Sequence, residues 1–189
     1  MDVLLKFIGD FWCGYNKIKS LKGLPKIDGG ICLDYNVGLK SLKWCPTIVN
    51  GDFSCSYCTS IKSLQFSPRE VHGDFDAVMC CLSSLDFCPE IVIGNFSVVA
   101  NKLESLENIH KNIKQIDSVF DCSGNPIKSH MLGLLCIKGL QKVLCDRKNI
   151  MHEPVQIINK YLEQPMSKQR MFDCQAELID AGFAEYAKL

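Results

Sequence analysis

The sequence predicts a solenoid, in which short units of similar sequence stack on one another and share a parallel β-sheet. Two observations support this prediction. Six segments with similar letters begin at residues 9, 29, 51, 73, 94 and 118, so the unit recurs at a nearly constant period. Each segment also repeats one order of apolar and polar positions, as in GDFSCSYCTSIKSL at residues 51–64. A period of this length is typical of solenoids, because one unit alone cannot bury its apolar side.

Each unit contains an apolar-x-apolar pair, which predicts a short strand with alternate side chains pointing inward. The first apolar column consists of Phe11, Ile31, Phe53, Phe75, Phe96 and Phe120. The second column consists of Cys13, Leu33, Cys55, Ala77, Val98 and Cys122. A third column consists of Asn16, Asn36, Cys58, Cys80, Asn101 and Asn125. We expect this third column to be buried, because Asn can satisfy backbone groups where the chain turns and a thiol fits the same small slot.

Cys55 and Cys58 form a CxxC pair, a pattern that can hold zinc or exchange disulfides. Both residues fall in repeat columns, and the sequence has no second CxxC pair to complete a zinc site. We therefore predict neither a metal nor a cofactor. The 12 cysteines are expected to act as small apolar residues of a reduced protein, because no secretory signal is recognisable. The expected location is the cytoplasm.

The repeat resembles the leucine-rich-repeat family over residues 9–129, which implies an α/β repeat with a parallel sheet on a concave face. Proline-containing turns follow four units, at Pro25, Pro46, Pro68 and Pro89. They favour a mostly irregular convex side. More narrowly, the units and the segment FDCQAELIDAGFAEYAKL at 172–189 resemble leucine-rich-repeat proteins of tailed bacteriophages. That resemblance implies a phage origin and the host cytoplasm as the place of action.

We divide the chain into a solenoid over residues 1–129 and a C-terminal capping segment over residues 130–189. Residues 134–137, LLCI, could form one last strand. Helices are expected from Pro154 and from Ser167, with Gly182 ending the second. Solenoid ends need caps, so this segment is interpreted as a cap, with partner binding as the alternative. Residues 1–8 must cap the other end or dock on another copy.

The exposed positions along the predicted strands are the candidate binding site. An aromatic ladder lies beside a set of carboxylates, and this combination is typical of protein interfaces. The candidate residues are Trp12, Tyr15, Asp34, Tyr35, Asp52, Tyr57, Asp74, Asp76 and Met79. The carboxylates would select a protein partner with a basic patch. The alternative is that the tyrosines only stabilise neighbouring units and the aspartates only keep the protein in solution.

Other classes of function have weaker support. Lys and Arg number 21, as do Asp and Glu, so no basic excess indicates nucleic-acid binding. A lysine column at Lys19, Lys40, Lys62 and Lys128 leaves nucleic-acid or nucleotide binding as an alternative. No apolar run is long enough to span a membrane, and no catalytic motif is present. We therefore predict a non-enzymatic module that binds and modulates a host protein, an anti-defence role included. A structural or self-assembling homo-oligomer is the other alternative.

Overall fold

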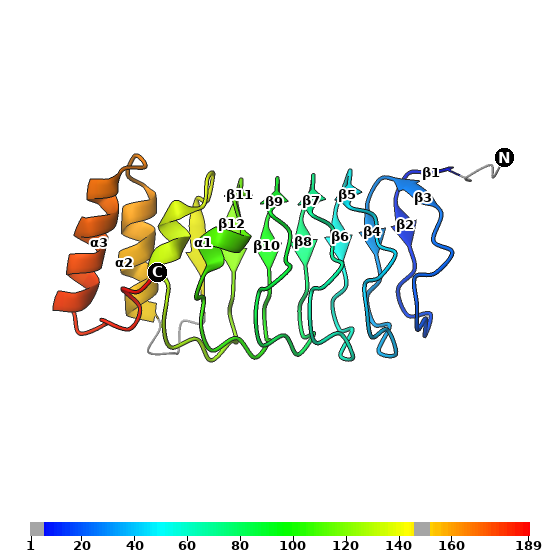
Figure 1. Cartoon of the computed structure of the whole chain (residues 1–189), viewed down its shortest axis with the longest axis horizontal. Coiled ribbons are helices and arrows are strands. Elements are labelled where there is room, and N and C mark those ends of the chain that lie inside the picture. Colours follow the sequence, from blue (N-terminus) through cyan, green and yellow to red (C-terminus); the bar gives the residue numbers. More distant parts are fainter. Residues whose placement is uncertain (1–5, 146–151) are drawn as a thin grey trace.

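The computed structural model describes residues 6–145 and 152–189. The chain forms a β-solenoid whose turns stack in a nearly straight line, with β1 at one end and two helices at the other (Figure 1). The main sheet has seven parallel strands in the order β13-β12-β10-β8-β6-β4-β2. They are β2 (Phe11–Trp12), β4 (Ile31–Cys32), β6 (Phe53–Ser54), β8 (Phe75–Asp76), β10 (Phe96–Ser97), β12 (Val119–Asp121) and β13 (Lys142–Leu144). Each turn thus pairs with the next one along the chain, as the repeat predicted.

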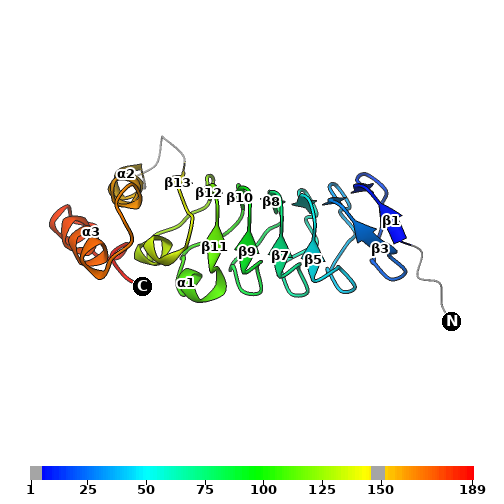
Figure 2. The same ribbon diagram turned by 90° about the horizontal axis from the view of Figure 1, so that it is seen from above.

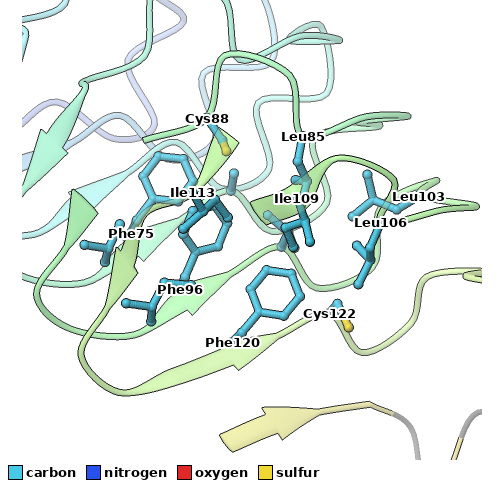
Figure 3. Packing of buried hydrophobic residues seen from close by; sticks show 14 of the residues in the cluster. Phe75, Leu85, Cys88, Phe96, Leu103, Leu106, Ile109, Ile113, Phe120 and Cys122 are labelled. Carbon is cyan, nitrogen blue, oxygen red and sulfur yellow. The ribbon is translucent and has the colours of Figure 1, made fainter. Parts of the chain in front are cut away.

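The phenylalanine column forms the centre of the core. The strands pair in register, so that Phe53 lies opposite Phe75 and Phe96 lies opposite Phe120. The ring centroids of Phe75 and Phe96 are 4.9 Å apart, and Figure 3 shows the phenylalanine rings side by side in the core. Because the turns have the same shape and stack in register, equivalent residues of successive turns lie next to one another. Each of these phenylalanine rings therefore packs closely against another aromatic ring.

A second parallel sheet runs along the solenoid beside the main one (Figure 2). Its four strands are β5 (Ile48–Val49), β7 (Glu70–Val71), β9 (Ile91–Val92) and β11 (Gln115–Ile116), and a separate pair joins β1 (Lys6–Ile8) to β3 (Lys26–Asp28). The expectation of a mostly irregular convex side is wrong here. The segment after each repeat proline becomes a strand because its apolar residue, such as Val71 or Val92, is fully buried and its backbone pairs with the next turn.

A glycine corner separates the two strands of most turns. A β-carbon on Gly73 would lie 2.8 Å from the backbone nitrogen of Asp52, and one on Gly51 would lie 2.8 Å from the backbone nitrogen of Gly30. Adjacent turns therefore approach too closely at this corner for any side chain. This explains the recurring glycine at the start of the units, because only glycine has no β-carbon to accommodate.

The segment before the last strand departs from the prediction. Residues 134–137 do not form a strand. Leu132–Cys136 forms the 3-10 helix η1, and β13 is the strand that extends the main sheet. Four consecutive residues of η1 are buried because the C-terminal helices cover its outer side. A strand would have buried only alternate residues. The only other short helix among the described residues is α1 (Ile109–Asn112).

Two helices cap the C-terminal end, α2 (His152–Leu162) and α3 (Lys168–Asp180). Ser167 begins α3 as predicted, and its hydroxyl accepts a hydrogen bond from the Arg170 amide at 3.0 Å. The Arg170 side chain donates to the Leu135 carbonyl at 2.5 Å and so ties α3 to η1. Asn159 of α2 accepts from the Val143 amide at 2.7 Å and donates to its carbonyl at 2.9 Å. This amide replaces the next strand at the edge of the main sheet. Residues 1–5 of the expected N-terminal cap lie outside the described residues.

Candidate binding face

We call the outward side of the main sheet, together with the residues that directly follow its strands, the strand face. Tyr15, Tyr35 and Tyr57 form one continuous stack on it. Their ring centroids lie 4.2 and 4.3 Å apart, with interplanar angles of 13° and 6°. Met79 occupies the same position in the next turn and is also exposed. The sequence-predicted ladder is therefore confirmed as a geometric feature, and it presents an aromatic edge to the solvent.

The backbone explains why these side chains point away from the core. Tyr15, Tyr35, Tyr57 and Met79 all have φ between 54° and 60°, in the left-handed region. The amide of each tyrosine still donates to the next turn, as from Tyr15 to the Asp34 carbonyl at 2.8 Å. Left-handed backbone is costly for a bulky residue. It persists here because neighbouring turns stack in register and fix the same bend in each.

Beside the stack lies a hollow of about 220 Å³, which we call the acidic hollow. Four carboxylates, the indole of Trp12 and main-chain atoms line it. The lining residues are Asp10, Trp12, Gly30, Ile31, Cys32, Asp34, Asp52, Ser54 and Asp76, with no lysine or arginine among them. Trp12 is 77% exposed at its rim. Residues from four successive turns thus form one negatively charged site beside an aromatic wall.

Three of the predicted acidic residues also accept hydrogen bonds from main-chain amides of the next turn. Asp52 accepts a hydrogen bond from the Asp74 amide at 2.8 Å, and Asp74 accepts one from the Asn95 amide at 2.7 Å. Asp34 accepts from the Ser56 amide at 2.8 Å and from the Ser54 hydroxyl at 2.5 Å. These carboxylates therefore stabilise the stack of turns in addition to creating a negative potential.

Asp76 differs from the other carboxylates. Burial, followed by the charges of Asp74, Asp34 and Asp52, raises the pKa of Asp76 to about 6. None of the ion pairs found among the described residues involves it. An ionised carboxylate crowded by others in this way is stabilised by a cation placed among them.

We predict that Asp76→Asn stabilises the protein at neutral pH. The folded-state pKa of Asp76 is raised above the unfolded value of 3.8. Protonation therefore favours the folded state, and this contribution is lost as the pH rises through about 6. Removing the charge should raise the free energy of unfolding by about 1 kcal/mol at pH 7, after allowance for solvent screening.

Thermal melts over a range of pH test this prediction. The difference between Asp76→Asn and wild type should shrink as the pH is lowered from about 7 to about 4, because the wild-type carboxyl then carries a proton. Glu107→Gln, at an exposed turn position, is the matched control and should show no such dependence. If Asp76→Asn is less stable than wild type at pH 7, the prediction that the charge of Asp76 destabilises the folded protein is wrong.

A second row of exposed aromatics was not identified from the sequence. Trp44, Phe66 and Phe87 stand two residues before the prolines of successive turns, with φ of 76°, 70° and 62°. They are 52%, 50% and 63% exposed. The recurring pattern Ser-Leu-x-aromatic-x-Pro was the signal that could have revealed this row. Trp44 lines a shallow groove with Ile48 of the second sheet, away from the acidic hollow.

The lysine column is exposed but short. Lys19, Lys40 and Lys62 occupy it in three successive turns. Ser83 and Glu104 replace lysine in the next two turns, and Lys128 lies 3.7 Å from Glu104 in an ion pair. The run of successive lysines in this column is thus confined to the N-terminal half of the solenoid.

The cysteines of the repeat columns are placed as predicted. None of the 12 cysteines, all of which lie within the described residues, forms a disulfide. Cys58 and Cys80 occupy the asparagine column and donate to the carbonyls of Leu33 and Cys55, at 3.2 and 3.1 Å. Burial raises the pKa of the Cys58 thiol to about 12, which leaves it protonated. Over residues 6–145 and 152–189, no cluster of three or more potential metal ligands occurs. No helix in the described part of the chain is long and apolar enough to cross a membrane.

The fold and the face together define a class of protein, a β-solenoid with parallel sheets and a repeat of about 22 residues, closed at one end by a pair of helices. Comparison with protein-family models, with curated proteins and with solved structures finds no significant match. The function of the protein therefore has to be inferred from the chemistry of the strand face.

Proposed function

We propose that the protein is a non-enzymatic binding module that holds a basic segment of a partner protein on its strand face. The observation that carries this proposal is the acidic hollow beside the tyrosine stack. Four carboxylates and one tryptophan meet there, and no basic side chain of the chain itself lines the hollow.

The chemistry of the hollow favours an arginine or lysine side chain as the ligand. The exposed indole of Trp12 offers an aromatic face to a cation, an arrangement that contributes about 0.5–2 kcal/mol. A cation between Asp76 and Asp34 would offset the repulsion that raises the pKa of Asp76. The tyrosine stack then provides a rigid apolar surface for neighbouring residues of the same segment, at little entropic cost.

The resemblance of the repeat to leucine-rich-repeat proteins, and to those of tailed bacteriophages in particular, motivates a more specific form of the proposal. The partner would be a host protein that the chain modulates, as an anti-defence factor does. Twelve cysteines without a disulfide are consistent with a reducing compartment, such as the host cytoplasm. This identification of the partner rests on resemblance, and the binding chemistry above does not depend on it.

Binding at the acidic hollow can be measured with a defined probe, a fluorescent peptide rich in arginine and lysine. Wild type should bind this peptide, and binding should weaken as salt is added, because screening reduces attraction between charges. Trp12→Ala should weaken binding about tenfold or more, because it removes the aromatic wall of the hollow. Fluorescence anisotropy gives the dissociation constants.

Trp44→Ala is the matched control, because Trp44 is an equally large exposed aromatic residue outside the hollow. It should bind the peptide as wild type does. Capture from a bacterial lysate by wild type and Trp44→Ala, but not by Trp12→Ala, would then identify the partner. Equal weakening by both substitutions, or equal binding of an acidic peptide, would refute the proposal.

A further inference from the structure

The two ends of the solenoid differ in whether the edge strand of the main sheet is covered. At the C-terminal end, Asn159 satisfies both the amide and the carbonyl of Val143, and two helices cover the core. At the N-terminal end, β2 pairs with β4 on one side, and no described strand pairs with its other side. An open edge of this kind offers hydrogen-bonding groups to another strand.

The hydrogen bonds show which groups face outward. The amides of Phe11, Cys13 and Tyr15 all donate to the second turn, at 2.8 Å each. Neighbouring residues in a parallel ladder alternate in direction, so the amides and carbonyls of Asp10, Trp12 and Gly14 face away from the solenoid. The Gly14 carbonyl also accepts a hydrogen bond from the Asn16 side chain at 2.9 Å, which leaves its second lone pair available.

The apolar columns are open at the same end. Phe11, Cys13 and Ile18 are only partly buried, whereas their equivalents in the third turn, Phe53, Cys55 and Ile61, are fully buried. Ile8 of β1 is 80% exposed. The unprotected area therefore includes the edge of β2, the apolar columns beside it and the exposed Ile8 of β1.

We propose that this end binds the same end of a second copy, so that the protein forms a two-fold symmetric dimer. A single extended peptide would pair with the edge of β2 only, whereas the end of a second solenoid also brings its own open apolar column against Phe11 and Cys13. The inference does not rest on the proposed function of the acidic hollow.

The edge of β2 is self-complementary in an antiparallel arrangement centred on Trp12. In that register, Trp12 pairs with Trp12 of the second copy, and Asp10 pairs with its Gly14. All outward-facing amides and carbonyls then meet groups that also face outward. The register sets two aromatic residues side by side and places no two aspartates opposite each other, and both features favour pairing. An isologous contact of this type closes the assembly at two copies.

Sedimentation velocity over a range of protein concentrations tests the dimer. Wild type should sediment as a dimer at high concentration and dissociate on dilution. Ile8→Lys should weaken association at least about tenfold, because it buries an unpaired charge in the contact. Ile48→Lys is the matched control, with the same change at an exposed position of β5, the edge strand of the second sheet and two turns away from β1, and it should associate as wild type does.

Hydrogen exchange gives a second, independent measurement on the wild-type protein. The amides of Asp10, Trp12 and Gly14 should exchange more slowly at dimer-forming concentration than after dilution. The proposal is overturned if wild type stays monomeric at every concentration, or if Ile8→Lys and Ile48→Lys associate equally. Protection of these amides by an added peptide, with wild type still monomeric, would instead identify strand addition by another chain. Each readout is separate from peptide binding at the acidic hollow, so either proposal can fail alone.

Discussion

Replacing Phe75 with alanine should lower the free energy of unfolding by about 3–5 kcal/mol, the range for truncating a fully buried phenylalanine. Phe75 has no exposed surface and stacks between two other rings, with centroids 5.6 Å from Phe53 and 4.9 Å from Phe96. A cavity at this point interrupts the aromatic column in the middle of the solenoid. The neighbouring turns cannot collapse into it, because their strands are fixed in register on both sides.

Chemical denaturation measures this loss, and Phe11→Ala provides the matched control. Phe11 occupies the same column in the first turn but is only partly buried. Its truncation should cost much less, about 1 kcal/mol or less, if the first turn is open as described. Equal costs at the two positions would mean that the first turn is covered in solution. Dimerisation would do this, so the comparison should be made at a concentration where the protein is monomeric.

Replacing Asn101 with alanine should cost a similar amount, about 3–5 kcal/mol, for a different reason. Its carbonyl oxygen accepts from the amides of Cys80 and Leu82, at 3.0 Å each. Its amide donates to the carbonyls of Ala77 and Val98, at 2.8 and 2.9 Å. Alanine would leave four buried backbone groups without these partners, and each unsatisfied group costs about 1–3 kcal/mol before the structure relaxes.

Two further variants separate hydrogen bonding from simple packing. Asn16→Ala removes the same residue from the exposed first turn, and it should cost under about 1 kcal/mol. Asn101→Cys copies the residue that the sequence itself places at positions 58 and 80. A thiol donates one hydrogen bond, as from Cys80 to the Cys55 carbonyl at 3.1 Å, but it accepts poorly. We therefore expect an intermediate loss. A loss as large as that of alanine would mean that the donated bond contributes little.

The columns of the repeat allowed much of the site to be predicted. Tyr15, Tyr35 and Tyr57 share one position in successive units, and stacking in register turns equal positions into spatial neighbours about 4.8 Å apart in the sheet direction. The ladder could therefore be predicted from the unit length alone. The second aromatic row at Trp44 and Phe66 obeyed the same rule and could have been found in the same way.

Other parts of the site could not be predicted in this manner. Asp10 and Asp52 share one column, but Asp34 and Asp76 lie in two others, and the convergence of all four on one hollow depends on how the corner and the strand bend in space. The role of Asp52 as a backbone acceptor likewise depends on the close approach of two turns at the glycine corner.

The sequence by itself determined the number and order of the turns, the identity of the core columns and the start of the last helix at Ser167. These features follow from a period and from local capping, which are properties of the chain alone. Only the tertiary structure decided that the two-residue segments such as Glu70–Val71 become strands, and that η1 replaces the strand expected at 134–137. A two-residue strand has no internal hydrogen bonds, and a buried 3-10 helix needs something to cover it. Both therefore exist only because neighbouring turns and the capping helices supply the missing partners.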